Sequence, residues 1–348
     1  MPNKEAPKID ELFAAVVKAG GSDLHLVSGR EPTVRVDGKL VALKKPPLTA
    51  RDIKELTMGM LAMEQQARFE TERELDLAHQ LVSGERFRVN LHWEKGAIGL
   101  AARLVPKKIP SPDELGLTEE MMSLAELPNG LVLLTGPAGS GKSTTLAAML
   151  NAINQSRAEN IITLEDPIEF LFPSGKSLVR QRELGQDMAS FAGGLKHLLR
   201  QDPNIIMVGE MRDLETIATT LTLAETGHLV FATLHTNNAA STIQRVIDVF
   251  SPHQQAQVKI QLAMTLRAVI SQHLLPRRGG GRVAAREYLL TNSAVANLIR
   301  ENKPEQIPTV IQTSARLGMF TLEQDLKRLV AAGTVAPEES SRLVIKNK

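Results

Sequence analysis

One glycine-rich stretch constrains this chain more than any other part of the sequence. It follows the apolar run Leu131–Leu134 and leads into Thr145–Leu150, which is rich in good helix formers. Its residues are Gly136, Pro137, Ala138, Gly139, Ser140, Gly141, Lys142, Ser143 and Thr144. A strand, a glycine-rich loop and a helix in this order form the context of a P-loop, whose backbone N–H groups point at phosphates. The helix N-terminus adds about half a positive charge at the same place.

Two side chains of this stretch have the chemistry that phosphates require. Lys142 can reach the β- and γ-phosphates, and the Ser143 hydroxyl can ligate Mg²⁺. A chance glycine-rich turn is the alternative, but the complete G-x-x-x-x-G-K-S spacing between a strand and a helix argues against it. The sequence therefore predicts a binding site for a nucleoside triphosphate.

Composition narrows the class of protein. The formal net charge is +2 and aromatic residues make up 3% of the chain, so the basic stripe with stacking aromatics that is typical of nucleic-acid binders is missing. Cysteine is absent, which excludes disulfides, Cys-ligated zinc and thiol catalysis. The sequence shows neither a secretory leader nor an apolar run of about 18 residues. We therefore expect a soluble intracellular protein with no nucleic-acid partner.

Residues 1–105 predict an α+β domain, because helices are set beside antiparallel strands. Apolar and polar residues alternate here with the period of a β-strand, so that Phe87, Val89 and Leu91 face one way and their neighbours the other. The predicted elements are a helix at Ile9–Ala19, strands at Leu24–Leu26 and Thr33–Val36, a hairpin turn at Asp37-Gly38, a helix from Thr49 to about Phe69, and strands at Arg86–Trp93 and Ala97–Val105.

Residues 106–125 are the predicted linker, because Pro and Lys are frequent between Pro106 and Pro112. Residues 126–348 predict an α/β domain with a mostly parallel sheet. Its C-terminal part is expected to be helical, with one helix running from Ser251 past Leu266 to Ile270, a strand at Arg282–Leu290 and a helix that begins at Thr321. The predicted parallel strands are Leu131–Thr135, Asn160–Leu164, Ile205–Val208 and Leu229–Thr233.

Carboxylates follow two of these strands, where ligands of open α/β sheets collect. Glu165, Asp166 and Glu169 come after the strand that ends at Leu164, and phosphoryl hydrolysis needs a group that orients or deprotonates water. Glu210 follows Ile205–Val208, where a Walker B carboxylate, more commonly Asp, approaches the Mg²⁺ side of a site. A solvated loop for the first group and a paired surface residue for Glu210 are the alternatives.

A histidine and two arginines complete the candidates. His235 ends the strand Leu229–Thr233, where it can sense a γ-phosphate or serve as a structural histidine; a second His or Cys at metal-ligand spacing is lacking. Arg88 and Arg103 lie on adjacent predicted strands of the first domain. They are either surface charges or, in a ring of subunits, arginine fingers that reach a neighbour's nucleotide and contribute about 10³–10⁵ in rate.

Together the motifs resemble the secretion ATPases and, within them, the family of type IV pilus retraction ATPases (PilT). The resemblance extends over nearly the whole chain. Two positions depart from the family pattern, because Ala296 and Lys196 each stand where an Arg is usual. The matching segments are the P-loop, Glu165–Glu169, Val208–Asp213, Gly227–Thr236, Ser22–Leu26, Arg86–Asn90 and Asn297–Glu301.

The resemblance implies a PAS-like N-terminal domain, a RecA-like ATPase domain with a helical C-terminal region, a homohexameric ring, and ATP with Mg²⁺ as ligands. It also implies a role for each candidate. Glu169 is the catalytic base, Glu210 the Walker B carboxylate that ligates Mg²⁺ together with Ser143, His235 the His-box residue, Glu165 and Asp166 supporting groups, and Arg88 and Arg103 the arginines that cross to a neighbouring site.

The expected function is that of a cytoplasmic motor that hydrolyses ATP to retract a type IV pilus. By resemblance it acts at the inner face of the inner membrane, held there through a pilus platform protein. An accessory retraction ATPase and a pilus-assembly or secretion ATPase stay open as alternatives, as does a RecA-type nucleic-acid translocase. A non-hydrolysing, nucleotide-dependent regulator is a further alternative, which the presence of both Glu169 and Glu210 disfavours.

Overall fold

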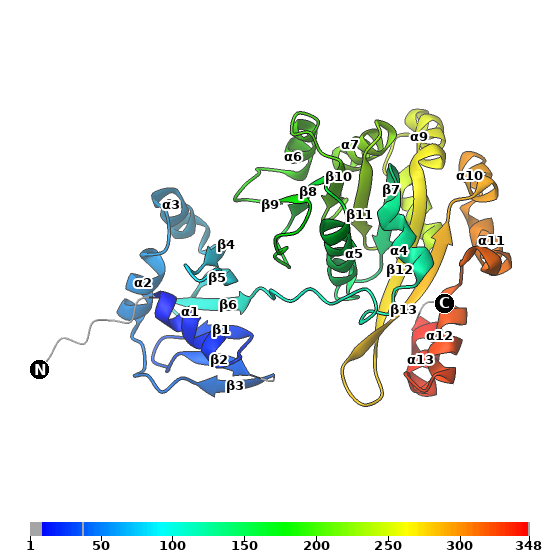
Figure 1. Cartoon of the computed structure of the whole chain (residues 1–348). Helices are drawn as coiled ribbons and strands as arrows, with labels where there is room; N and C mark the ends of the chain where they lie inside the picture. The colour runs from blue at the N-terminus through cyan, green and yellow to red at the C-terminus, as the bar shows by residue number, and fades with distance from the viewer. Residues whose placement is uncertain (1–8, 37, 347–348) are drawn as a thin grey trace, which may run out of the picture. The chain divides into compact units, whose positions relative to one another are not determined.

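The computed structural model describes residues 9–36 and 38–346 (Figure 1). The chain forms two compact units, the first ending at Lys107 and the second beginning at Lys108. This division falls inside the stretch 106–125 predicted as a linker. Asp37, half of the predicted hairpin turn, lies outside the described residues.

The first unit is a six-stranded antiparallel sheet in the order β3-β2-β1-β6-β5-β4. The predicted alternation on β5 is observed, since Phe87, Val89 and Leu91 are fully buried and pack in one core with Phe13. The elements are α1 (Ile9–Lys18), β1 (Asp23–Leu26), β2 (Thr33–Val36), β3 (Lys39–Ala42), α2 (Ala50–Met58), α3 (Met63–Glu72), β4 (Glu74–Gln80), β5 (Arg86–Glu94) and β6 (Ala97–Leu104).

The single helix predicted from Thr49 to Phe69 is wrong, because the chain breaks it into α2 and α3. Thr49 does cap the start of α2 with a capping box, but the helix ends at Met58, with Gly59 as its C-cap. The break buries Leu61 in the core, and the Gln66 side-chain amide donates to the freed carbonyls of Met58 and Leu61, each at 3.0 Å. Burial of Leu61 and this amide therefore compensate for the lost helical hydrogen bonds.

The second unit is a seven-stranded sheet in the order β13-β12-β7-β11-β10-β8-β9, in which only the edge pair β12–β13 is antiparallel among the described strands. The strands are β7 (Gly130–Thr135), β8 (Asn160–Glu165), β9 (Leu178–Glu183), β10 (Ile205–Val208), β11 (Leu229–Leu234), β12 (Leu266–Pro276) and β13 (Arg282–Leu290). The helices are α4 (Glu119–Met122), α5 (Lys142–Ser156), α6 (Phe191–Leu198), α7 (Leu214–Glu225), α8 (Ala239–Asp248), α9 (Pro252–Thr265), α10 (Ser293–Arg300), α11 (Ile307–Thr313), α12 (Leu322–Ala331) and α13 (Pro337–Lys346).

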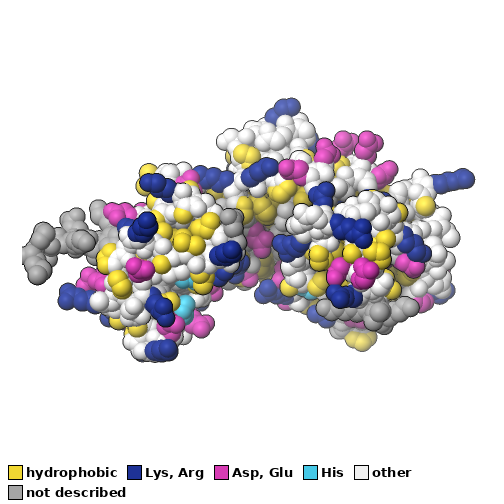
Figure 2. All heavy atoms as spheres, turned by 90° about the horizontal axis from the view of Figure 1, so that it is seen from below, with side chains coloured by type: hydrophobic (Ala, Val, Ile, Leu, Met, Phe, Trp, Pro, Cys, Tyr) yellow, Lys and Arg dark blue, Asp and Glu magenta, His cyan; other side chains and the backbone are white. Residues whose placement is uncertain are grey.

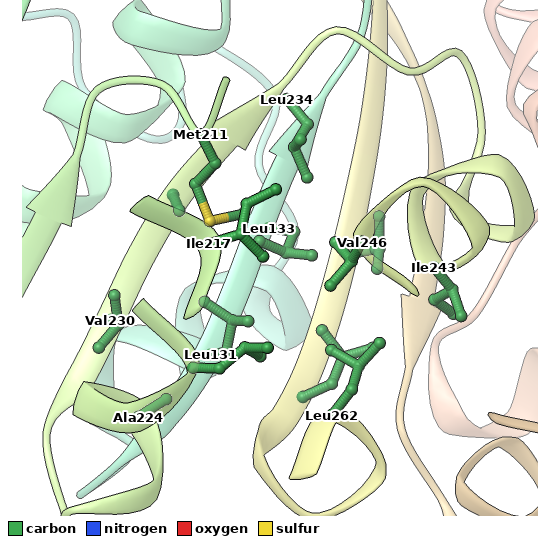
Figure 3. Close-up of a cluster of buried hydrophobic side chains, with 14 of the residues drawn as sticks. Leu131, Leu133, Met211, Ile217, Ala224, Val230, Leu234, Ile243, Val246 and Leu262 are labelled. Carbon is green, nitrogen blue, oxygen red and sulfur yellow. The ribbon is translucent and has the colours of Figure 1, made fainter. Parts of the chain in front are cut away.

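Helices cover both faces of this sheet, so its strands are apolar on both sides. Leu131 and Leu133 of β7 point to the side of α7, α8 and α9, where Ile217, Val246 and Leu262 meet them (Figure 3). The alternate residues of β7 enter a second cluster with α5. Strand β7 is therefore held firmly from both faces, and the loop that follows it starts from a rigid base.

The helix predicted to run past Leu266 is the main error in the second unit. Helix α9 ends at Thr265, and Leu266 begins β12, which pairs with β7 on one side and β13 on the other. Because both faces of β12 are buried, its run of apolar residues has no alternation by which a strand differs from a helix. The prediction also lacked β9, whose sequence Leu178–Glu183 is mostly polar.

Close packing accounts for one of the two adjacent glycines in α6. A Cβ on Gly194 would lie 2.9 Å from Met188 Sδ and 3.3 Å from a Leu164 methyl group. Gly194 therefore lets α6 approach β8 closely, next to the strand end that carries the candidate carboxylates.

Candidate nucleotide-hydrolysing site

The loop between β7 and α5 has a backbone that glycine makes possible. Gly136, Gly139 and Gly141 have φ of +136°, +74° and +87°, values that other residues rarely adopt. The first α5 hydrogen bond of the helical type runs from the Thr145 N–H to the Gly141 carbonyl at 3.0 Å. The N–H groups of the first turn have no partner within a helix and are available to an anion.

Lys142 lies buried under this loop. Its Nζ donates to the carbonyls of Gly136 (2.8 Å) and Pro137 (3.1 Å). Burial lowers the pKa of Lys142, while the charges of Glu210 and Glu169 act in the opposite direction. The lysine is thus held inside the loop and faces two carboxylates across the site.

The structure brings the predicted carboxylates and histidine to the same place as the loop. An open cavity of about 260 Å³ lies at the carboxyl ends of β8, β10 and β11. Parallel strands that end at one edge of a sheet explain why residues distant in the chain meet here. Among its lining residues are Ala138, Gly139, Lys142, Ser143, Glu165, Asp166, Glu169, Glu210, Arg212, Thr233 and His235.

The remaining residues of the predicted loop support it or face another cavity. Gly136, Pro137 and Ser140 offer their carbonyls to the side chains of Lys142 and Gln272 behind the loop. Gly141 and Thr144 line a second cavity of about 690 Å³, which is also bordered by exposed arginines of the β12–β13 turn.

Glu210 is the centre of a charged cluster. It accepts hydrogen bonds from Arg212 Nη2 (2.7 Å) and from His235 Nε2 (3.1 Å). Burial by itself raises the pKa of Glu210, but the hydrogen bonds and charges of Arg212 and His235 prevail and hold that pKa below its usual value. Arg212 also lies 3.9 Å from Asp166. Arg212 was not predicted, although its place after Glu210 is a signal, since an arginine there can pair with both carboxylates.

Glu165 differs from the other carboxylates because it is buried. It accepts from Thr163 Oγ1 (2.6 Å) and Gln181 Nε2 (3.0 Å), and burial raises the pKa of Glu165. Gln181 also donates to the Phe170 carbonyl at 2.8 Å. Glu165 and Gln181 therefore fix both ends of the loop that carries Glu169.

Arg88 and Arg103 lie in the first unit, directly opposite each other on β5 and β6. Both side chains are exposed on the same face of the sheet. Arg103 Nε donates at 2.8 Å to the buried carboxylate of Asp23, so this guanidinium is oriented by an acid.

The donor set fits Mg²⁺ only in the presence of a triphosphate. Within residues 9–36 and 38–346 we find no group of three or more His, Asp or Glu placed to hold a metal ion. Ser143 and Glu210 line one cavity and offer the oxygen donors that Mg²⁺ takes, while water and phosphate oxygens usually supply its other ligands.

Comparison with known proteins agrees with this geometry. The family model described as "Type II/IV secretion system protein" matches residues 5–281. The chain belongs to this family. It is 47% identical over 332 residues to the type IV pilus retraction ATPase PilT of Pseudomonas aeruginosa, with 95% of this chain and 96% of the relative covered. It is 46% identical over 312 residues to a twitching motility protein of Neisseria gonorrhoeae, with 89% and 83% covered.

This chain superimposes on the crystal structure of the pilus retraction motor PilT with bound ADP with a TM-score of 0.89. The two are 44% identical, and 96% of each chain is covered. The similarities confirm the predicted family. They also confirm the predicted fold class, an N-terminal domain followed by a RecA-like ATPase domain with a helical C-terminal region.

Proposed function

We propose that this chain is a motor that hydrolyses ATP to retract a type IV pilus. One observation carries the enzymatic part: the cavity that joins Lys142 and Ser143 of the phosphate loop to Glu169 and Glu210. The pilus part is supported by the relatives, which are named a pilus retraction ATPase and a twitching motility protein.

The first step is seating of the triphosphate. The loop N–H groups receive the phosphates, and Lys142 exchanges its two loop carbonyls for β- and γ-phosphate oxygens. Burial lowers the pKa of Lys142, and the charges of Glu210 and Glu169 oppose this lowering. Ser143 and Glu210 would hold Mg²⁺, which when bound would neutralise negative charge on the phosphates.

The second step is attack of water on the γ-phosphorus. Glu169 orients the water and takes its proton while the bond between the γ-phosphorus and the bridging oxygen breaks, which leaves ADP and phosphate. Glu210, His235 and Arg212 form one hydrogen-bonded unit at 2.7 and 3.1 Å. His235 in this unit senses whether a γ-phosphate is present, and Asp166 holds Arg212 from the other side.

The third step couples hydrolysis to movement between subunits of a homohexamer. Arg88 and Arg103 reach the nucleotide of a neighbouring subunit and neutralise charge in the transition state. Residues 106–125 serve as the linker between a domain of residues 1–105 and one of residues 126–348, and closure of one domain against the next subunit produces the movement.

The partner in this proposal is a pilus platform protein of the inner membrane, reached from the cytoplasm. No helix of the described chain is long and apolar enough to cross a bilayer. On the face seen in Figure 2, Lys and Arg side chains are interspersed with Asp and Glu. A mixed surface of this kind suits protein partners better than the phosphate backbone of a nucleic acid.

Removal of the gene product tests the direction of force. Cells without it should carry abundant surface pili that never shorten, and a chain with Glu169→Gln should fail to restore shortening. Bald cells would instead indicate a pilus-assembly ATPase. Salt-sensitive stimulation of hydrolysis by DNA would favour the nucleic-acid translocase.

A further inference from the structure

Strands β12 and β13 present a buried polar pair to the back of the phosphate loop. Gln272 and Arg286 are directly opposite each other in the antiparallel register, so their side chains share a face. They are 2% and 3% exposed. Burying two such polar groups costs free energy unless they form hydrogen bonds. Their hydrogen-bond partners therefore indicate the role of the pair.

Gln272 contacts the phosphate loop with one end of its amide and helix α5, which follows the loop, with the other. Nε2 donates to the Ser140 carbonyl at 2.7 Å, and Oε1 accepts from Thr145 Oγ1 at 3.0 Å. Arg286 Nε donates to the same Oε1 at 3.0 Å. Because Thr145 and Arg286 are donors here and the Ser140 carbonyl is an acceptor, this orientation of the amide satisfies all three partners.

The guanidinium of Arg286 continues the chain of hydrogen bonds away from the loop. Nη2 donates to the Leu115 carbonyl (2.9 Å) and Nη1 to the Gly116 carbonyl (3.2 Å). These two residues lie near the start of the second unit, which begins at Lys108. The Arg286 backbone N–H donates to the buried Asp325 at 2.8 Å, which holds β13 against α12.

We propose that Gln272 and Arg286 are positioning residues that couple the phosphate loop to the turn formed by residues 112–117. Displacement of the Ser140 carbonyl when phosphates bind moves the Gln272 amide, which moves Arg286 and with it the Leu115 and Gly116 carbonyls. The movement is transmitted because a broken contact would leave a buried polar atom unpaired. This inference rests on the proposed function, since it takes the loop to hold a nucleotide.

The absence of cysteine makes a site-specific test simple in the full-length chain. Asp113 is exposed within the turn, so Asp113→Cys accepts a nitroxide spin label. The mobility of the label is measured by electron paramagnetic resonance without nucleotide and with saturating ADP or a non-hydrolysable ATP analogue, each with Mg²⁺. Binding of a fluorescent ADP is measured separately.

Two variants interrupt different links. Gln272→Glu keeps an acceptor for Thr145 and Arg286 but turns an oxygen toward the Ser140 carbonyl, so it cuts the contact with the loop and keeps the rest. Arg286→Lys keeps the charge, but a single ammonium cannot serve Gln272 and two carbonyls in the planar arrangement of a guanidinium. Arg282→Met is the matched control, because Arg282 is exposed on the same cavity wall.

Nucleotide should change the mobility of the label in the parent and in Arg282→Met, and most of that change should be lost in Gln272→Glu and Arg286→Lys at saturation. A parent that binds nucleotide without any response of the label overturns the coupling, and so does a response that persists in both variants. The response of the label in the parent can be interpreted whether or not the two variants fold. A parent that binds no nucleotide overturns the proposed function instead.

Discussion

Replacing Gly136 by alanine tests how the phosphate loop is seated on the sheet. Gly136 has φ of +136°, where a residue with a side chain costs about 1–3 kcal/mol of backbone strain. Its Cβ would lie 2.2 Å from the Gln272 carbonyl oxygen. Because that oxygen belongs to the backbone of β12, it cannot rotate away, and overpacking adds about 1–3 kcal/mol. Gly136→Ala should therefore lower the free energy of unfolding by about 2–6 kcal/mol.

Gly139 supplies a matched control within the same loop. It has φ of +74°, but a Cβ there meets nothing within 4 Å. Only the left-handed backbone cost of about 1–2 kcal/mol applies to Gly139→Ala. Because the strain of a positive φ is of similar size at the two positions, the additional loss in Gly136→Ala reports the contact with β12.

Urea unfolding followed by circular dichroism measures both variants against the parent. The loss for Gly136→Ala should exceed that for Gly139→Ala, with similar dependence on urea concentration in each case. Equal losses, or a loss below about 1 kcal/mol for Gly136→Ala, would refute the close seating of the loop on β12.

Three further results follow from the site. Glu169→Gln should lower kcat for ATP by about 10²–10⁴-fold with little change in the affinity for a non-hydrolysable ATP analogue. Phosphate release measures the first quantity and analogue binding the second. A loss of affinity as large as the loss of kcat would contradict a role of Glu169 as the base. Arg88→Ala should slow ATP hydrolysis by the assembled ring without changing the stability of the first unit. Arg103→Ala should slow hydrolysis and also destabilise the first unit, because buried Asp23 loses a 2.8 Å hydrogen bond. Unchanged hydrolysis in both variants would argue against a role of these residues as arginine fingers. Burial raises the pKa of Glu287 above the ordinary 4.5, so its stabilising contribution is complete below that value and is lost as pH rises through the folded-state pKa. Glu287→Gln keeps the acceptor for the Ala239 N–H, and its thermal stability relative to the parent should increase with pH above 4.5; a difference that stays constant with pH would contradict the shift.

The phosphate loop and its carboxylates could be predicted because their signals are local. The spacing of Gly136, Gly141 and Lys142 is set by the backbone turn itself. Glu165 and Glu210 each follow an apolar strand, and the edge at which parallel strands end brings such residues together. In these cases a short segment contains the physical reason for its structure.

Strand β12 could not be predicted for the opposite reason. Leu266 follows α9 without a glycine or proline to mark a boundary, and burial on both faces removes the alternation that identifies a strand. Pairing with β7, which is distant in the sequence, decides the outcome. Gln272 and Arg286 were missed with it, because their roles depend on a strand pair that the sequence pattern does not reveal.

We infer that the cavity beside the phosphate loop splits ATP, and phosphate release provides the test. Phosphate release by the purified full-length chain with ATP and Mg²⁺ is compared with that of Lys142→Ala, which removes the ammonium between Glu169, Glu210 and the loop. We predict sustained release by the parent and none above background for the variant. A parent that releases no more phosphate than Lys142→Ala would show that this cavity does not hydrolyse ATP.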